Sequence, residues 1–307
     1  MEFRPLFSLF IRRMDGRAKV ERGSHDVAYA EIHGKLENKA NRRPDSDVVV
    51  LSNIVEGSEF SSGAEALSVR YVARGRESYS LAGRGHQVEA GQVMIASHRD
   101  GAAGDVRNPD RRGTLGLCTL VHVSADDLEW LRSPLVMSAE CTPLGMILHK
   151  GVETLWAPRP DKPEVAKQII GSLRAELPNL AARVLSQAAA ARGAKASTRF
   201  EMVRRAMLAQ CYLHSTTGRS VDLNELARAV AVSPFHLLAG FQHCFGETPA
   251  AYHRKLRLKL AMEKAERSGI PISTVADEFG FAGGSSLSHA HKRAFGRPPR
   301  QRRSAAG

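Results

Sequence analysis

Between residues 47 and 125, the residues that could support metal catalysis are three histidines and one carboxylate. His86, His98 and His122 are the histidines between residues 47 and 125, and Glu77 is a carboxylate that could join them. A catalytic metal ion needs three or more ligands that converge on it and leave one position open. These four residues share no ligand spacing. We therefore expect no metal, no cofactor and no catalytic residue, and we do not expect an enzyme.

Lysine and arginine in the last third of the chain indicate a different chemistry. From Ser220 to the end there are 13 lysines and arginines against 7 aspartates and glutamates, which gives a net charge of +6 (13 − 7) out of +12 for the whole chain. Such an excess favours a polyanionic partner, although many solvated surfaces are also basic. The charge needs an independent signal before a partner can be named.

A repeat supplies that signal. The motif F-G-x-x-P occurs as FGETP at 245–249 and as FGRPP at 295–299. Upstream of it, Val230 matches Phe279 at an offset of 49 residues, and the offset is 50 at the motif itself. Each copy predicts the same unit, a short helix followed by a tight turn and a longer helix, with one extra residue in the turn of the second copy.

Capping residues mark the helix ends in the first copy. Asp222 and Glu225, three residues apart, form a capping box for the short helix. Ser233 and Pro234 predict the N-cap and the first residue of the longer helix, and Gly246 predicts its end. Apolar residues four or eight positions apart predict the buried faces of the two longer helices: Leu237, Phe241, Phe245, Leu287 and Phe295.

Two helices joined by a short turn form a helix-turn-helix unit, whose second helix can enter the major groove of DNA. Between the two copies, AAYHRKLRLKLAMEKAERSG at 250–269 predicts one helix about 30 Å long. Successive major-groove faces on one side of a duplex are about 34 Å apart. The sequence therefore predicts two DNA-reading units held one turn of the duplex apart.

Residues from about 220 to 303 resemble the DNA-binding domain of AraC/XylS-type transcriptional regulators. The resemblance rests on LARAVAVSPFHLLAGF, FGETPAAYHRKLRLKLA and VADEFGFAGGSSLSHAHKRAFGRPP. It implies a sequence-specific regulator that binds double-stranded promoter or operator DNA, and that contacts RNA polymerase if it is an activator.

The family pattern also implies which residues face DNA. By position, the two recognition helices would present to the bases Phe235, Leu238, Ala239, Gly284, Ser285, Ser288 and His289. Most of these side chains are small or apolar and can make few hydrogen bonds to base edges, and Phe235 fits a core position equally well. We therefore expect much of the affinity to come from sequence-blind, salt-sensitive phosphate contacts by Arg254, Lys255, Arg257, Lys292, Arg293 and Arg297.

Residues 47–125 are typical of short β-strands separated by turns. The expected strands are DVVVLSNI, ALSVRYVARG, ESYSL, HQVEA, QVMIAS and TLGLCTLVHV, and their regular spacing favours a small barrel or sandwich. The stretch RYVARGRESYSLAGRGHQVEAGQVMIA resembles, loosely, the cupin-like sensing domain of the same family. Such a barrel can hold one small ligand, so we expect an effector near Arg70, Tyr71 and Tyr79; a filled barrel that only supports dimerisation fits equally well.

The expected fold class is α+β. Its parts are a partly flexible N-terminal extension (1–46), a cupin-like β-barrel or sandwich (47–160), a helical connector that supports a homodimer (161–216) and an all-α tandem helix-turn-helix domain (217–307). Two alternatives stay open: a cupin-type enzyme with an accessory DNA-binding domain, and a non-specific nucleic-acid-binding protein.

The remaining sequence signals concern the setting of the protein. Four widely spaced cysteines without a C-x-x-C pair favour reduced thiols and a cytoplasmic location. No run approaches the roughly 18 apolar residues of a membrane span, so we expect no membrane partner. The working start is Met1 or Met14.

Overall fold

The structure is a computed structural model of the 307-residue chain. It divides into two compact units, Met1–Ser186 and Gln187–Gly307. The residues that it describes are 19–22, 27–34, 47–54, 58–62, 66–81, 84–97, 102–106, 113–123, 130–131, 133–158, 160–191, 195–268 and 270–295. Met1 and Met14 lie outside these ranges.

The N-terminal unit is built on a mostly antiparallel sheet. Among the described residues this sheet has seven strands in the order β1-β2-β3-β10-β5-β8-β11, and the pairs β4–β9 and β6–β7 form two smaller sheets. The strands are β1 (Lys19–Arg22), β2 (Val27–Gly34), β3 (Asp47–Ile54), β4 (Ser58–Ser62), β5 (Ala66–Arg74), β6 (Arg76–Leu81), β7 (Arg84–Glu89), β8 (Gln92–Ser97), β9 (Ala102–Val106), β10 (Thr114–His122) and β11 (Leu135–Ser138).

The expected strands are confirmed, but the expected barrel is not. The six segments form β3, β5, β6, β7, β8 and β10. Within the described part of the chain β1 and β11 are the two edges of the large sheet and do not pair, so no closed barrel is formed there. The cupin-like assignment of this unit stays a prediction.

Strand β2 shows that part of the expected N-terminal extension belongs to the sheet. It pairs in parallel with β3, from Val27 opposite Asp47 to Gly34 opposite Ile54. The side chains of Ala28, Tyr29 and Ala30 are buried. The segment was missed because alanine and glycine have weak strand propensity, so its sequence carries little local signal. The boundary expected at residue 46 is therefore wrong for residues 27–34.

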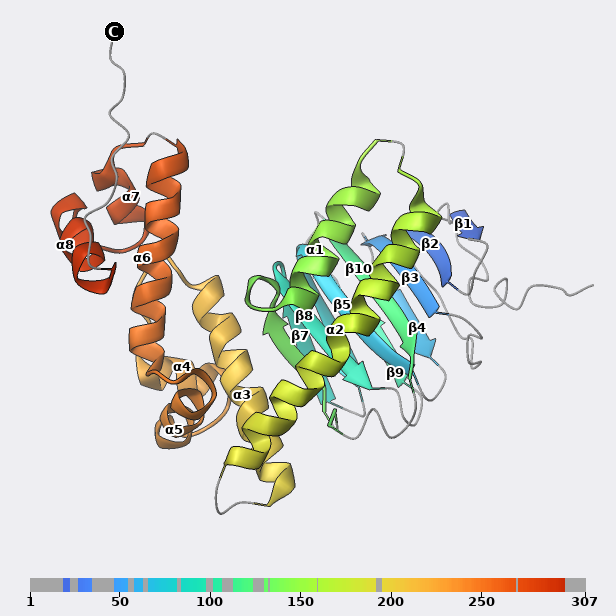
Figure 1. The fold of residues 1–307 in the computed structure, drawn as a ribbon, viewed down its shortest axis with the longest axis horizontal. Helices are drawn as coiled ribbons and strands as arrows, with labels where there is room; N and C mark the ends of the chain where they lie inside the picture. Colours follow the sequence, from blue (N-terminus) through green and yellow to red (C-terminus); the bar gives the residue numbers. More distant parts are fainter. Residues whose placement is uncertain are drawn as a thin grey trace, which may run out of the picture. The chain divides into compact units, whose positions relative to one another are not determined.

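Helices α1 (Pro143–Trp156) and α2 (Lys162–Ala190) cover the same face of the large sheet (Figure 1). Gly151 allows their close approach. A Cβ atom at this position would lie 2.8 Å from Cδ1 of Ile169 on α2 and 3.1 Å from Cδ2 of Leu117 on β10. A larger residue would therefore push α1 away from both neighbours.

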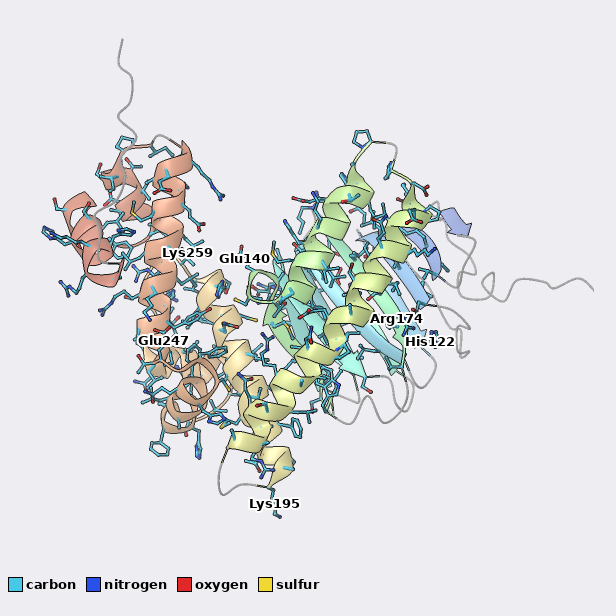
Figure 2. The ribbon with its side chains drawn as sticks, viewed as in Figure 1. His122, Glu140, Arg174, Lys195, Glu247 and Lys259 are labelled. Carbon is cyan, nitrogen blue, oxygen red and sulfur yellow. The ribbon has the colours of Figure 1, made fainter. Side chains whose placement is uncertain are left out.

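An ion-pair cluster fixes α2 on the sheet. Nε and Nη2 of Arg174 each donate a hydrogen bond of 2.9 Å to the carboxylate of Asp47. The backbone N–H of His122 donates to the same carboxylate at 2.9 Å, and its carbonyl accepts from Arg174 at 3.2 Å. Figure 2 shows Arg174 beside His122 at the end of β10. The buried Asp47 therefore has several donors that offset its loss of water.

The C-terminal unit is helical. Its helices are α3 (Ala196–Ser215), α4 (Leu223–Ala229), α5 (Pro234–Phe245), α6 (Pro249–Ser268), α7 (Ile272–Glu278) and α8 (Gly284–Phe295). In Figure 1, α4 and α5 lie at one end of α6, and α7 and α8 lie at the other. The expected linker helix between the two copies is therefore confirmed.

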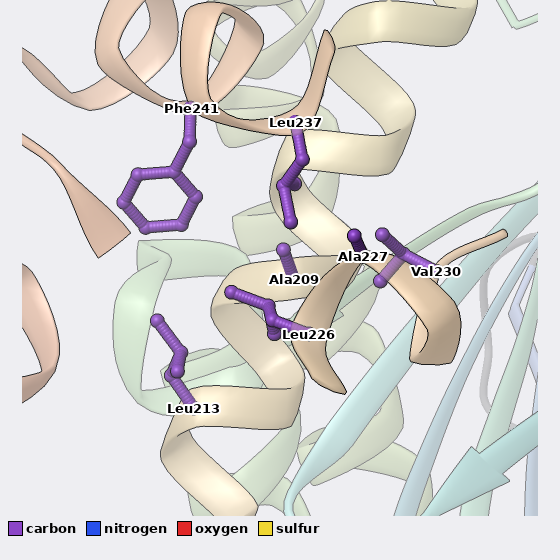
Figure 3. Close-up of a cluster of buried hydrophobic side chains, with 7 residues drawn as sticks. All are labelled: Ala209, Leu213, Leu226, Ala227, Val230, Leu237 and Phe241. Carbon is purple, nitrogen blue, oxygen red and sulfur yellow. The ribbon is translucent and has the colours of Figure 1, made fainter. Parts of the chain in front are cut away.

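Each copy has its own apolar core. Figure 3 shows the first core, where Leu226 and Val230 meet Leu237 and Phe241 of α5. Ala209 and Leu213 of α3 complete this cluster. The second core contains Leu258, Ala261, Met262, Val275, Ala276, Phe279 and Leu287.

The place of α3 differs from the expected boundary at residue 216. Because Ala209 and Leu213 pack into the core of the first copy, α3 belongs to the compact C-terminal unit, which begins at Gln187. A free connector would not bury these side chains. The periodicity of α3 gives an apolar face, but it does not say which partner covers that face.

The helix ends follow the sequence signals. The Asp222 carboxylate accepts from the Glu225 N–H at 2.9 Å, and the Ser233 hydroxyl accepts from the His236 N–H at 3.3 Å. Gly246 ends α5 in the left-handed conformation with φ of 74°. Among the helices formed by described residues, none is both long and apolar enough to span a bilayer.

Candidate nucleic-acid interface

The two helix-turn-helix copies have the same dimensions. Helices α4 and α7 have 7 residues each, and α5 and α8 have 12 residues each. The connecting turns are residues 230–233 in the first copy and residues 279–283 in the second. The extra residue expected in the second turn is therefore confirmed.

Both turns use the same hydrogen-bonding motif. The Val232 N–H donates to the Ala227 carbonyl at 3.0 Å, and the equivalent bond of the second copy is 2.8 Å long. The residue before each donor is left-handed, Ala231 with φ of 53° and Gly280 with φ of 64°. This is a Schellman motif, which satisfies the last carbonyls of a helix and turns the chain sharply.

Helix α5 presents one face to the core and one to the outside. Leu237 and Phe241 are buried, whereas Ala239 is exposed and Leu238 is half-buried. Phe235 is 77% exposed, so it is not a core residue. Two of the expected base-contacting side chains, Phe235 and Ala239, therefore lie open at the surface of α5.

Helix α8 has a matching arrangement. Leu287 is fully buried, while Ser285 and His289 are exposed and Ser288 is partly exposed. Gly284 has a packing role instead, because a Cβ atom there would lie 2.9 Å from Cγ2 of Ile272. The expected base-contacting residues that α8 exposes are thus small polar groups and one imidazole.

Basic side chains are exposed on α6 and α8. Arg254 and Lys255 are exposed on α6, and Lys292 and Arg293 are exposed on α8. Nζ of Lys255 lies 2.9 Å from Oε2 of Glu247, so this cation already has a carboxylate partner. Arg297, also expected at phosphate, lies outside the described residues.

Arg257 does not lie at the surface, and the expectation that it contacts phosphate is wrong for this structure. Its side chain is buried, with Nε 3.0 Å from the Phe279 carbonyl oxygen and Nη2 2.8 Å from that of Gly280. The guanidinium also lies 4.8 Å from the centroid of the Phe281 ring. Burial lowers the pKa of Arg257. The sequence placed it among exposed cations because its partners come from a distant turn.

Known proteins are similar in sequence to this part of the chain. A family model described as "Helix-turn-helix domain" matches residues 226–305. A protein of Streptomyces antibioticus described as an AraC-like transcription regulator is 33% identical over 88 residues, which is 29% of this chain and 29% of that protein. The HTH-type transcriptional regulator GbdR of Pseudomonas aeruginosa is 36% identical over 83 residues, 27% of this chain and 23% of that protein.

The C-terminal helix-turn-helix domain is similar to that of AraC-like transcription regulators. The match spans less than a third of the curated relatives' length. A solved AraC-type regulator structure from Chromobacterium violaceum is similar at 22% identity and a TM-score of 0.30, covering 31% of this chain and 85% of that one.

The AraC-type domain also exposes a residue that the sequence reasoning missed. Gln242 is exposed on α5, three residues after Ala239 and seven after Phe235, so the three share one helix face. A glutamine amide can pair with both the N6 and N7 atoms of adenine. The spacing of seven residues, or two helical turns, between Phe235 and Gln242 is the sequence signal that identifies Gln242 as a member of this face.

The residues expected near an effector are divided between the two faces of the sheet. Arg70 donates to both carboxylate oxygens of Glu77, at 2.7 and 2.6 Å, and the Tyr79 hydroxyl donates to the same carboxylate. Tyr71 lies on the opposite face, where its hydroxyl is 2.8 Å from Nδ1 of His149 on α1. Neighbouring strand residues point to opposite faces, so Arg70 and Tyr71 do not line one pocket.

The candidate metal ligands are also not brought together. In the part of the chain with described placement, no group of three or more His, Cys, Asp or Glu side chains could hold a metal ion. Glu77 is occupied by Arg70 and Tyr79, and burial raises the pKa of Tyr79 well above its usual value. His98 lies outside the described residues.

Proposed function

We propose that the chain is a sequence-specific transcriptional regulator that binds two adjacent major grooves of double-stranded DNA through α5 and α8. The observation that supports this most directly is the repetition of the reading unit. Each copy ends its first helix with the same turn and exposes one face of its second helix. The 20-residue helix α6 between them is about 30 Å long, close to the roughly 34 Å repeat of a duplex.

In this proposal the two kinds of exposed side chain have different roles. Phe235, Ala239 and Gln242 of α5 and the Ser285 and His289 side chains of α8 face base edges, which carry sequence information. The cations Arg254, Lys255, Lys292 and Arg293 face phosphates, which position the protein without reading sequence.

The test is selection of duplexes from a random pool by the full chain, followed by footprinting. We expect one enriched sequence with two half-sites about one helical turn, or 10 base pairs, apart. Binding to it should persist against a large excess of random duplex. Equal competition by random duplex would favour a non-specific nucleic-acid-binding protein instead.

Salt dependence tests the phosphate role of one cation. The exposed Arg293 at the C-terminal end of α8 is expected to contribute about one unit to the slope of log K against log salt. Arg293→Ala should therefore lower affinity for selected and random duplexes alike and reduce that slope by about 1. Glu266→Ala on α6, which removes an exposed anion, is the control and should leave the slope unreduced.

We assign a regulatory role to the N-terminal unit, which is compact in its own right. In this proposal the N-terminal unit is not an enzyme. It binds a small-molecule effector and supports a homodimer in the cytoplasm. If the protein activates transcription, this unit also helps to position the protein for RNA polymerase. Native mass spectrometry of the purified chain would detect a retained ligand and the number of copies. A monomer without ligand that binds its operator fully would contradict both assignments.

A further inference from the structure

Helix α6 is joined to the rest of the AraC-type domain by buried polar side chains as well as by apolar packing. His253 Nε2 lies 2.8 Å from the carbonyl oxygen of Thr216, just after α3. Arg257, four residues later on the same face of α6, donates to the carbonyls of Phe279 and Gly280 in the second turn. One face of α6 therefore bonds both to the segment before the first copy and to the turn inside the second.

These two segments also contact each other directly. A Cβ atom at Gly280 would lie 2.6 Å from the carbonyl oxygen of Gly218 and 3.0 Å from Cα of Arg219. A Cβ atom at Gly218 would lie 3.3 Å from the carbonyl oxygen of Glu278. Backbone thus meets backbone between the chain before α4 and the turn between α7 and α8, without side chains in between.

We propose that Arg257 is a positioning residue that fixes the rotation of α8 relative to α5. Arg257 bonds α6 to the turn 279–280, and this turn packs against the segment 216–219, which His253 bonds to the same helix. These contacts form one brace, so the two reading units cannot turn about the α6 axis independently. Arginine suits this place because its planar guanidinium presents several donors at once, and carbonyl oxygens offset the cost of burying its charge. The inference rests on the proposed function, because the brace is inferred to make DNA binding selective for the spacing of the two half-sites.

The experiment uses the full chain and the duplex that the wild type selects. One base pair is inserted between the half-sites, which moves the second by about 3.4 Å and rotates it by about 35°. The measured quantity is the ratio of affinities for the natural and the altered spacing. We expect a ratio of about 30 for the wild type, the scale of one or two lost base contacts, and less than about 3 for Arg257→Ala.

The ratio does not depend on the fraction of protein that is folded, so a merely destabilising substitution would leave it unchanged. Lys259→Ala, on the exposed side of the same helix (Figure 2), is the matched control and should keep the wild-type ratio. Arg257→Lys, which keeps the charge but loses the planar fork, should recover part of it.

A wild-type ratio in Arg257→Ala, or a wild type that ignores spacing, would overturn the inference. If Arg257→Ala cannot be purified folded, Gly218→Ala takes its place, because it keeps Arg257 and brings a methyl group against the Glu278 carbonyl oxygen. If the ratio of affinities for the two spacings is the same in Gly218→Ala as in the wild type, the brace is contradicted as well. If the wild type enriches no sequence at all, the proposed function fails instead.

Discussion

At the residue scale, the exposed ring of Phe235 has no explanation in folding. Burying an aromatic side chain stabilises a fold by about 1.5–3 kcal/mol relative to leaving it exposed. Because Phe235 is 77% exposed, most of this stabilisation is absent. The ring stands at the beginning of α5, on the face shared with Ala239 and Gln242. In a major groove, thymine offers an apolar methyl group that such a ring can cover.

Phe235→Ala is expected to weaken binding to the selected duplex by about 1–3 kcal/mol, with little change in stability. Replacing thymine by deoxyuridine in the first half-site, which removes only the methyl group, should weaken the wild type but not the variant. Ile270→Ala, another exposed apolar residue of the same unit, is the control and should bind like the wild type. Equal loss on deoxyuridine in both proteins would contradict the contact.

The buried His253 gives the AraC-type domain a pH dependence. Burial lowers its pKa from the usual 6.5, despite the hydrogen bond to Thr216. Below about pH 6.5 the unfolded chain therefore binds this proton more readily than the folded one, and the free energy of unfolding falls as pH falls. Amide hydrogen exchange in α3 and α6, corrected for intrinsic rates, should show lower protection at pH 5 than at pH 7. In His253→Gln, whose side-chain amide does not titrate, the loss of protection between pH 7 and pH 5 should be smaller. An equal loss in this variant and in the wild type would show that other groups cause the pH dependence.

At the element scale, the turns of the two helix-turn-helix copies have the same backbone conformation but use different residues for it. Both need a left-handed residue, and the first copy uses Ala231 where the second uses Gly280. A non-glycine residue pays roughly 1 kcal/mol for this conformation. At Gly280, the backbone of Gly218 leaves no room for a Cβ atom, whereas Ala231 is exposed.

Ala231→Gly is therefore expected to raise the free energy of unfolding of the C-terminal unit by roughly 0.5–1 kcal/mol. Gly280→Ala should lower it by more than about 1 kcal/mol, because strain and the 2.6 Å approach to the Gly218 oxygen act together. Thermal unfolding of the full chain, followed by far-UV circular dichroism, measures both. Effects of equal size and sign at the two sites would contradict the difference between the turns.

At the scale of the whole molecule, the chain has two separately cored units. In the N-terminal unit, Arg70 of β5 and the fully buried Glu77 of β6 join the β6–β7 hairpin to the large sheet. In the C-terminal unit, the two helix-turn-helix cores share α6 between them. A change in one core should therefore leave the stability of the other unit unchanged.

Glu77→Ala leaves Arg70 buried without its carboxylate and should destabilise the N-terminal unit by about 3–5 kcal/mol. The chain has 2 tryptophans, Trp130 and Trp156, both in this unit, so their fluorescence in a urea titration reports it alone. Glu153→Ala, an exposed carboxylate on α1, is the control and should cost at most about 1 kcal/mol. Equal loss of protection from hydrogen exchange in α4 to α8 would contradict the independence of the two units.

The sequence by itself determined the features that depend on neighbouring residues. The repeat, the caps at Asp222 and Ser233, the longer turn of the second copy and the core positions Leu237, Phe241 and Leu287 all follow from spacing and local hydrogen bonding. Strands rich in β-branched residues, such as β3 and β8, were placed correctly for the same reason.

Only the tertiary structure decided which partner each residue meets. The buried place of Arg257 depends on Phe279, 22 residues away, and the burial of Arg70 on a hairpin folded over its strand. The open sheet, the inclusion of β2 and the packing of α3 on α5 likewise come from contacts between distant segments. Periodicity predicts which face of a helix or strand becomes buried. It does not predict which segment packs against that face, because the hydrophobic effect has no directional preference and many apolar partners would fit.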